Sequence, residues 1–138
     1  MRGQGTEILT STKNPKVKDA IKLMDRRQRD QTGLMLIEGV KELSLAIKDG
    51  VTISRLFYCE DLFRGAEEQR ILKEADVQGA ELIHVGANVF KKLAYREDSF
   101  GLIAVARQPT KTLNDIPMKK TPLIIVVEGV EKPGNLGA

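Results

Sequence analysis

The chain has 138 residues, of which 41% are hydrophobic and 30% charged, and its formal net charge is +3. This composition is typical of a globular protein with room for one domain, or for one domain and part of a second. Its single cysteine excludes an intramolecular disulfide, and no apolar run resembles a signal peptide or is long enough to cross a bilayer. We therefore expect a cytoplasmic protein without a membrane partner.

The first predicted helix begins at Asn14, a favourable N-cap residue, with Pro15 at the first helical position. We expect one helix that continues to about residue 29. Its apolar face recurs at i, i+4 and i+7: Val17, Ile21 and Met24. A neighbouring basic stripe recurs at i, i+4, i+8 and i+11: Lys18, Lys22, Arg26 and Arg29.

Positive charge is concentrated in this helix. Between residues 13 and 29, seven basic side chains stand against two acidic ones, a net charge of +5. The rest of the chain is therefore slightly acidic. An asymmetry of this kind favours a polyanionic partner at one end of the protein.

Strands and helices then alternate along the chain. We expect strands at residues 34–37, 51–58, 81–85 and 102–106, with helices that end at about residue 49, residue 78 and residue 93. The alternation predicts an α/β domain with a mixed, mostly parallel sheet covered by helices on both faces. Residues 107–122 contain three prolines without periodicity, which indicates a linker, and the apolar run at 123–127 predicts a further buried strand.

A glycine-rich loop follows that last predicted strand, with Asn135 set between two glycines. It is not a P-loop, because Asn135 and Leu136 stand where lysine and a hydroxyl residue are needed. It is not a dinucleotide fingerprint either, because Lys132 replaces the first glycine. A plain turn would account for the glycines alone. However, open α/β sheets bind ligands just past the carboxyl ends of their strands.

Four stretches of the chain resemble one family. VVEGVEKPGNLGA at residues 126–138 resembles the first signature motif of the SpoU (TrmH) branch of the trefoil-knot, or SPOUT, RNA methyltransferases. The substrate-binding domain of that family is similar to three earlier stretches: TSTKNPKVKDAIKLMDRRQRD, GLMLIEGVKELSLAI and FKKLAYREDSFGLIAVA. The four stretches occur in the order found in the family and cover nearly all of residues 9–138.

The resemblance implies methyl transfer from S-adenosylmethionine to a ribose 2′-hydroxyl, with ribosomal RNA as the expected substrate and transfer RNA as the alternative. It implies three parts, namely an RNA substrate-binding domain at residues 1–107, a linker at 108–122, and the first strand and motif loop of a truncated methyltransferase domain at 123–138. The first part is expected to have the fold of ribosomal proteins that bind kinked RNA.

The resemblance also implies where the chemistry lies. Asn135 matches the catalytic asparagine of the motif, whereas the arginine of the family and its knotted cofactor loops would lie beyond Ala138. The full-length protein is therefore expected to bind S-adenosylmethionine and to form a homodimer through the missing domain. This chain alone is expected to be a monomer that is inactive and binds no cofactor.

RNA contacts are expected from the basic helix, because lysine and arginine along one stripe meet successive phosphates. The complete predicted set is Asn14, Lys18, Lys22, Arg26, Arg29, Glu38, Lys91, Lys92 and Arg96. A solvated helix face is the alternative for the stripe. A favourable interaction with the helix dipole explains Glu38 equally well.

Two other functions stay open on the sequence. The chain would be a stand-alone RNA-binding domain if the last strand completed its own sheet, or a nucleotide-binding regulatory domain if only the glycine loop counted. No metal site is expected, because the only histidine, His84, and the only cysteine, Cys59, cannot build one.

Overall fold

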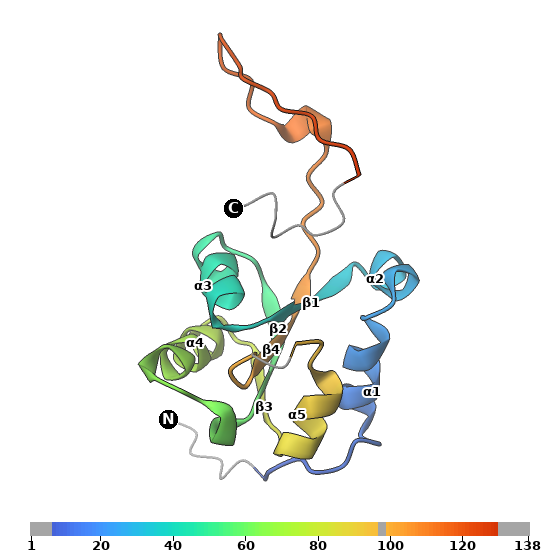
Figure 1. The fold of residues 1–138 in the computed structure, drawn as a ribbon, viewed down its shortest axis with the longest axis vertical. Coiled ribbons are helices and arrows are strands. Elements are labelled where there is room, and N and C mark those ends of the chain that lie inside the picture. The colour runs from blue at the N-terminus through green and yellow to red at the C-terminus, as the bar shows by residue number, and fades with distance from the viewer. Residues whose placement is uncertain (1–6, 97–98, 130–138) are drawn as a thin grey trace.

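The computed structural model of the chain describes residues 7–96 and 99–129. Five α-helices, four strands and two short 3₁₀ helices lie in these ranges (Figure 1). In chain order they are α1 Pro15–Lys22, α2 Arg26–Thr32, β1 Leu34–Glu38, α3 Val40–Lys48, β2 Ile53–Tyr58, η1 Glu60–Leu62, α4 Ala66–Val77, β3 Glu81–His84, α5 Ala87–Leu93, β4 Leu102–Arg107 and η2 Leu113–Asp115.

The four strands form one sheet in the order β1-β4-β2-β3. The mixed α/β class is confirmed, but the expectation of a mostly parallel sheet is wrong. Only β2 and β3 pair in parallel, whereas β4 is antiparallel to both β1 and β2. The reason is that the last strand inserts between the first two, so β1 and β2 run in the same direction without touching each other.

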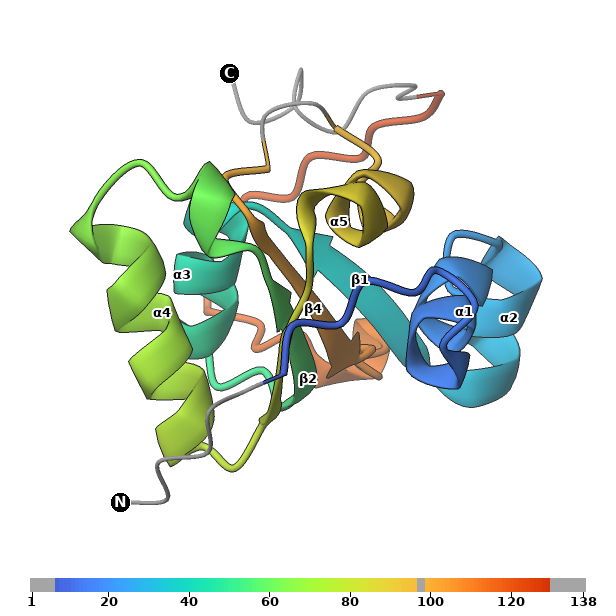
Figure 2. The same cartoon turned by 90° about the horizontal axis from the view of Figure 1, so that it is seen from below.

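Helices cover both faces of the sheet (Figure 2). On one face α1 and α5 pack over a core that includes Val17, Phe57 and Phe90, each at most 2% exposed. On the other face α3 and α4 pack over a second core around Leu43 and Ile71. Alternate residues of a strand face opposite sides of a sheet, so a strand between two helical layers contributes to both cores. For this reason the strands read as continuous apolar runs.

The predicted basic helix is in fact two helices. Asn14 caps α1 as expected, since its side-chain oxygen accepts a hydrogen bond from Lys16 N at 2.9 Å. However, α1 ends at Lys22, and Asp25 begins α2 by accepting a hydrogen bond from Arg27 N at 2.7 Å. The spacing of i, i+4 and i+7 expected for one continuous helix therefore does not hold after the turn between α1 and α2. Met24, expected on the buried face, is 41% exposed.

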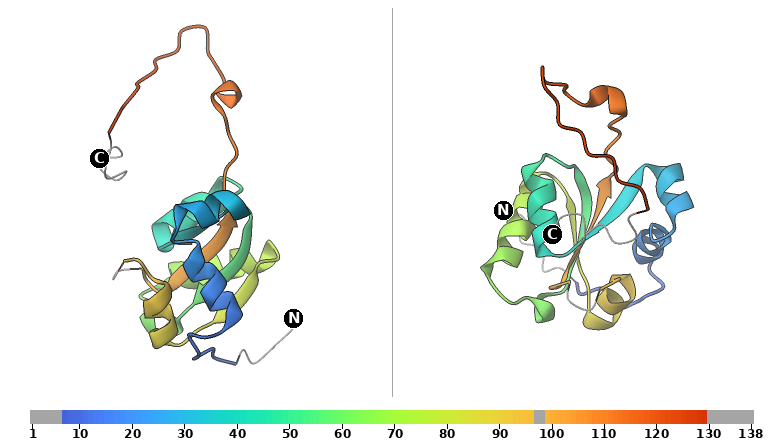
Figure 3. Two further views of the ribbon diagram at one scale, coloured as in Figure 1. Left: turned by 90° about the vertical axis from the view of Figure 1, so that its right-hand side faces the viewer. Right: turned by 45° about the horizontal axis from the view of Figure 1, so that its top comes forward.

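The segment after β4 leaves the sheet and extends away from it (Figure 3). All residues from 109 to 129 are exposed, and the only regular element among them is η2. The predicted buried strand at residues 123–127 is not found, because these five side chains are between 50% and 91% exposed and pair with no described strand. A strand needs a neighbour for its backbone hydrogen bonds, and the described part of the chain offers none there.

Candidate nucleic-acid interface

The basic side chains of α1 and α2 project into solvent. Lys22 donates a hydrogen bond to Asp19 at 3.0 Å, and Arg26 lies 3.7 Å from Asp30, yet both basic side chains are more than 60% exposed. Lys18 is also exposed and has no ion-pair partner among the described residues. Exposed ion pairs of this kind contribute little to stability. These cations can therefore exchange an acidic neighbour for a phosphate at low cost.

Arg29, the fourth member of the predicted stripe, has a different environment. Its Nη1 atom donates hydrogen bonds to the backbone oxygens of Leu23 at 3.0 Å and Met24 at 2.8 Å. These carbonyls lie just past the end of α1, where a helix leaves acceptors without intrahelical partners. Arg29 thus fastens α2 to the end of α1, and its side chain is partly committed to the fold.

Glu38, at the end of β1, binds the loop after α5. Its two carboxylate oxygens accept hydrogen bonds from Tyr95 N and Arg96 N, each at 2.9 Å. The two residues are more than fifty positions further along the chain. The strand register brings them together, because β1 pairs with β4 and Glu38 lies opposite Ile103. We refer to Glu38 and these two backbone amides as the Glu38 clamp.

The side chain of Arg96 is held by a second carboxylate. Its Nη1 atom donates to Glu42 Oε1, on α3, at 2.8 Å. Burial of the Glu42 carboxyl opposes its ionisation, but the hydrogen bonds from Arg96 and from its own backbone, together with the charges of Arg96 and Lys41, lower the pKa of Glu42 overall. The same contact raises the pKa of Arg96. Arg96 is therefore oriented by the fold although it remains 62% exposed.

These groups line an open cleft of about 650 Å³ beside the edge strand β1. The cleft brings together three sequence-predicted residues from three separate elements: Arg29, Glu38 and Arg96. A second hollow of about 460 Å³ lies beside the last turn of α5 and includes Lys91. Lys91 and Lys92 are exposed and have no ion-pair partner among the described residues. By contrast, Asn14, Lys18, Lys22 and Arg26 line neither hollow.

Sequence reasoning missed Tyr95, which lines both hollows and is 88% exposed. The chain has only two tyrosines, and the other, Tyr58, is buried and stacks on His84 with ring centroids 4.7 Å apart. An aromatic residue in a polar stretch beside Lys91, Lys92 and Arg96 was the signal available. Aromatic side chains interleaved with cations are typical of surfaces that bind single-stranded nucleic acid.

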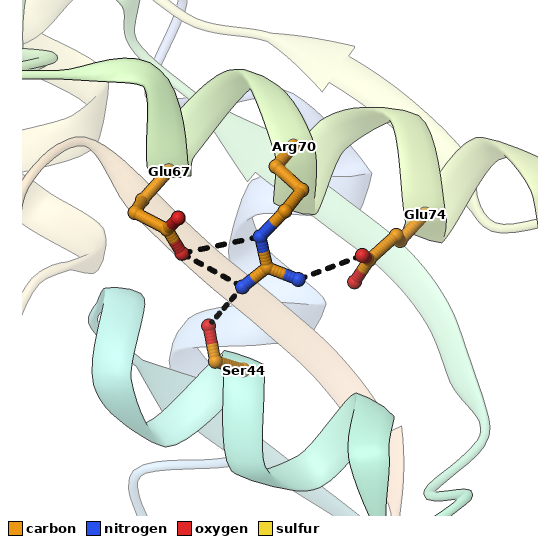
Figure 4. A network of polar contacts seen from close by, with 4 residues as sticks. All are labelled: Ser44, Glu67, Arg70 and Glu74. Atoms are coloured by element: carbon orange, nitrogen blue, oxygen red, sulfur yellow. Dashed lines mark hydrogen bonds and ion pairs between the residues drawn. The ribbon is translucent and has the colours of Figure 1, made fainter.

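The opposite face of the sheet carries a network of a different kind (Figure 4). Arg70, on α4, donates to Glu67 at 2.7 and 3.1 Å, to Glu74 at 2.7 Å and to Ser44 of α3 at 3.0 Å. The hydrogen bonds to Glu67 and Glu74 raise the pKa of Arg70. The bond to Ser44 ties α4 to α3. Two carboxylates surround the guanidinium of Arg70, so this network does not suit an anionic ligand.

Residues 7–96 and 99–129 contain no group of three His, Cys, Asp or Glu side chains placed to hold a metal ion. Within the same ranges no helix has the length and hydrophobicity needed to cross a bilayer. The predicted catalytic residue Asn135 lies outside the described residues.

The sequence of the chain matches a known domain family. Residues 14–104 match the MRM3-like substrate binding domain. The chain belongs to this family. The match includes α1, the Glu38 clamp and the first half of β4, and it confirms the resemblance inferred from the sequence motifs.

Individual relatives of this MRM3-like chain are longer proteins. An uncharacterised tRNA/rRNA methyltransferase of Synechocystis sp. is 29% identical over 94% of the chain and 46% of its own length. The 23S rRNA (guanosine(2553)-2′-O)-methyltransferase RlmP of Bacillus subtilis is 26% identical, again over 94% of the chain and 47% of its own length. The chain thus spans about half the length of the curated relatives it matches.

Two solved structures of methyltransferases are also similar to this chain. The crystal structure of an RNA 2′-O ribose methyltransferase superposes with a TM-score of 0.77 and 37% identity, covering 95% of the chain and 49% of that protein. An rRNA methyltransferase from Sinorhizobium meliloti has a TM-score of 0.67 and 24% identity, covering 82% of the chain and 41% of that protein. The second likeness shows the fold alone.

Proposed function

We propose that this chain is the RNA-binding portion of an S-adenosylmethionine-dependent RNA ribose 2′-O-methyltransferase. One observation carries the proposal: the chain is 37% identical, over 95% of its length, to an RNA 2′-O ribose methyltransferase whose fold it shares. Ribosomal RNA is the proposed substrate, because RlmP, a relative of this chain, acts on 23S rRNA. A cytoplasmic location follows from that substrate.

The proposed division of labour has three parts. Residues 1–107 bind RNA, residues 108–122 are a linker, and residues 123–138 open the methyltransferase domain. The exposure of residues 109–129 and the lack of strand pairing at 123–127 support this division, since a linker and a segment without neighbouring strands are both expected to lie in solvent. The same features disfavour a stand-alone domain whose sheet is completed by that strand.

In this proposal S-adenosylmethionine supplies the methyl group, and the described residues serve only to hold the RNA. Phosphate contacts from lysine and arginine fix the register and orientation of a nucleic acid without reading its sequence. Positioning of this kind lowers the barrier of a transfer reaction by bringing the hydroxyl to the donor. Asn135 is the proposed catalytic residue of this chain, and partners of the transfer step lie in the methyltransferase domain.

The RNA-binding claim is tested by the salt dependence of affinity. Five exposed cations on α1, α2 and α5 are proposed to meet phosphates: Lys18, Lys22, Arg26, Lys91 and Lys92. At roughly 0.7 to 0.9 per phosphate, the slope of log affinity against log salt should be about −3.5 to −4.5 for ribosomal RNA fragments.

A double variant, Lys18→Ala with Lys22→Ala, is expected to reduce that slope by about 1.5. The matched control is Lys48→Ala with Lys73→Ala, two exposed lysines on the helices that cover the opposite face of the sheet. Fluorescence anisotropy with labelled RNA measures both. Equal slopes for the two double variants would show that the α1 lysines belong to a solvated face, and a chain without salt-dependent RNA affinity would refute the proposal.

The catalytic part is tested separately. Calorimetry with this chain at millimolar S-adenosylmethionine is expected to show no saturable heat. The whole gene product is expected to transfer a labelled methyl group to ribosomal RNA and to sediment as a dimer, whereas residues 1–138 sediment as a monomer. RNA affinity without methyl transfer by the whole gene product would favour a binding module over an enzyme.

A further inference from the structure

We propose that Tyr95 is a stacking platform for an unpaired base of the RNA, and that the Glu38 clamp holds it in position. The inference rests on the proposed function and adds to it the kind of RNA that is recognised. Its starting point is the contrast between the side chain of Tyr95 and its backbone. The side chain is 88% exposed, whereas the backbone amide is fixed by a carboxylate at 2.9 Å.

Two carboxylates hold the loop that follows α5. Glu38 binds two successive amides, and Glu42 then binds the side chain of the second residue, Arg96. Two carboxylates are thus committed to holding a dipeptide whose aromatic ring has no hydrogen bond or ring contact among the described residues. A ring whose backbone is held before binding has less conformational freedom to lose when a ligand stacks on it. This arrangement fits a recognition surface better than a structural one.

The surroundings match one nucleotide and its flanking phosphates. Tyr95 and Arg96 line both hollows, whose volumes are about 650 and 460 Å³, so both spaces border the residue that carries the ring. Lys91 lines the smaller hollow and Arg29 lines the larger one. A base that stacks on Tyr95 would therefore have a cation in each adjoining hollow to meet its flanking phosphates.

The ring also selects between classes of RNA. In a duplex each base face is covered by its neighbours, and the accessible groove displays edges, hydroxyls and phosphates. Only an unstacked base offers a face to an aromatic side chain. We infer that the RNA presents a loop, bulge or single strand at Tyr95, while phosphates of the adjoining stem meet the lysines of α1.

The experiment compares two RNA probes of equal length and charge. One is a hairpin with a loop of unpaired adenosines, one of which is replaced by 2-aminopurine, and the other is a fully paired duplex. Tyr95→Ala is expected to weaken binding of the hairpin about 5- to 150-fold, the range found when one base loses its aromatic stacking partner. Binding of the duplex should not change. Tyr95→Phe, which keeps the ring and removes the hydroxyl, should bind both probes like the unaltered chain.

The clamp is tested by Glu38→Gln, which keeps one acceptor oxygen and replaces the other by an NH₂ donor. Amide exchange at Tyr95 and Arg96 should accelerate, and hairpin affinity should fall while duplex affinity is kept. In the Tyr95→Ala background the same change should have no further effect on hairpin affinity, because a positioning residue acts only through the group it positions. An equal loss in both backgrounds would show that Glu38 acts in another way and would overturn its assigned role.

The 2-aminopurine signal gives an independent readout. Its emission should be quenched when the unaltered chain binds and should recover with Tyr95→Ala. If Tyr95→Ala binds the hairpin as tightly as the unaltered chain, while the α1 double variant loses affinity for both probes, the stacking inference is wrong and the proposed function stands. If the unaltered chain binds neither probe, both are wrong.

Discussion

Replacement of Arg29 by alanine should destabilise the fold, although sequence periodicity places this residue among the RNA contacts. The change removes both hydrogen bonds that Nη1 donates to the backbone oxygens of Leu23 and Met24. These oxygens follow the last turn of α1, so no helical amide takes the place of the guanidinium.

The magnitude follows from the kind and the exposure of these bonds. A hydrogen bond to a charged group contributes about 1.5 to 3 kcal/mol, and less where water can replace the donor. One bond is partly buried and the other exposed, so we expect a total loss of about 1 to 3 kcal/mol in the free energy of unfolding. With a urea dependence of roughly 1 to 3 kcal/mol per molar, the unfolding midpoint should fall by about 1 M at an unchanged slope.

Urea unfolding followed by far-ultraviolet circular dichroism is the assay, because the chain has no tryptophan. Arg27→Ala is the matched control, since Arg27 lies on the same helix, is exposed and has no ion-pair partner among the described residues. Its free energy of unfolding should stay within about 0.5 kcal/mol of the unaltered chain. If Arg29→Ala unfolds at the same midpoint as Arg27→Ala but loses RNA affinity, the structural role of Arg29 is refuted.

Three more results are expected. Gly101→Ala should lower the free energy of unfolding by about 3 kcal/mol or more, because its left-handed backbone (φ +74°) is strained for alanine and a Cβ atom would press on the backbone oxygen of Cys59. Gly79→Ala has a similar φ of +85° but open space around it, so thermal unfolding should show a loss of only about 1 kcal/mol. Amides at residues 123–127 should exchange rapidly while those of β1 and β4 stay protected, and slow exchange in that segment would instead indicate a paired strand. The lowered pKa of Glu42 means that its ion pair stabilises the fold above the unfolded pKa of about 4.3, and that this stability is lost as the pH falls through the lower folded pKa. In Glu42→Gln the urea midpoint should therefore fall less steeply below about pH 4.5, and the same pH dependence as in the unaltered chain would argue against the pair.

Local features of the fold were readable from the sequence. The start of α1 at Asn14 and Pro15, the four strands and the ends of the later helices all agree with the structure to within about two residues. Capping residues and apolar periodicity act between neighbours in the chain, so short windows contain the necessary information. The family was also readable, because its motifs are contiguous stretches in a fixed order.

The α1–α2 junction shows where local reading reaches its limit. A spacing of i, i+4, i+8 and i+11 looks like one stripe only if the helix is unbroken. In the structure Asp25 caps a new helix, and Leu23 turns into the core at 5% exposure. Burial of Leu23 and the bonds from Arg29 favour the turn, and neither is visible in a window that assumes a continuous helix.

Tertiary structure alone decided the strand order and, through it, the candidate site. Insertion of β4 between β1 and β2 places the loop after α5 beside the end of β1, and only there do the amides of Tyr95 and Arg96 meet Glu38. The sequence indicated that Glu38 and Arg96 were of interest, but it gave no reason to join them, and the aromatic signal at Tyr95 did not reveal that Glu38 holds its backbone. Contacts between residues more than fifty positions apart leave no periodic trace in the chain, because packing of the whole sheet determines which segments become neighbours.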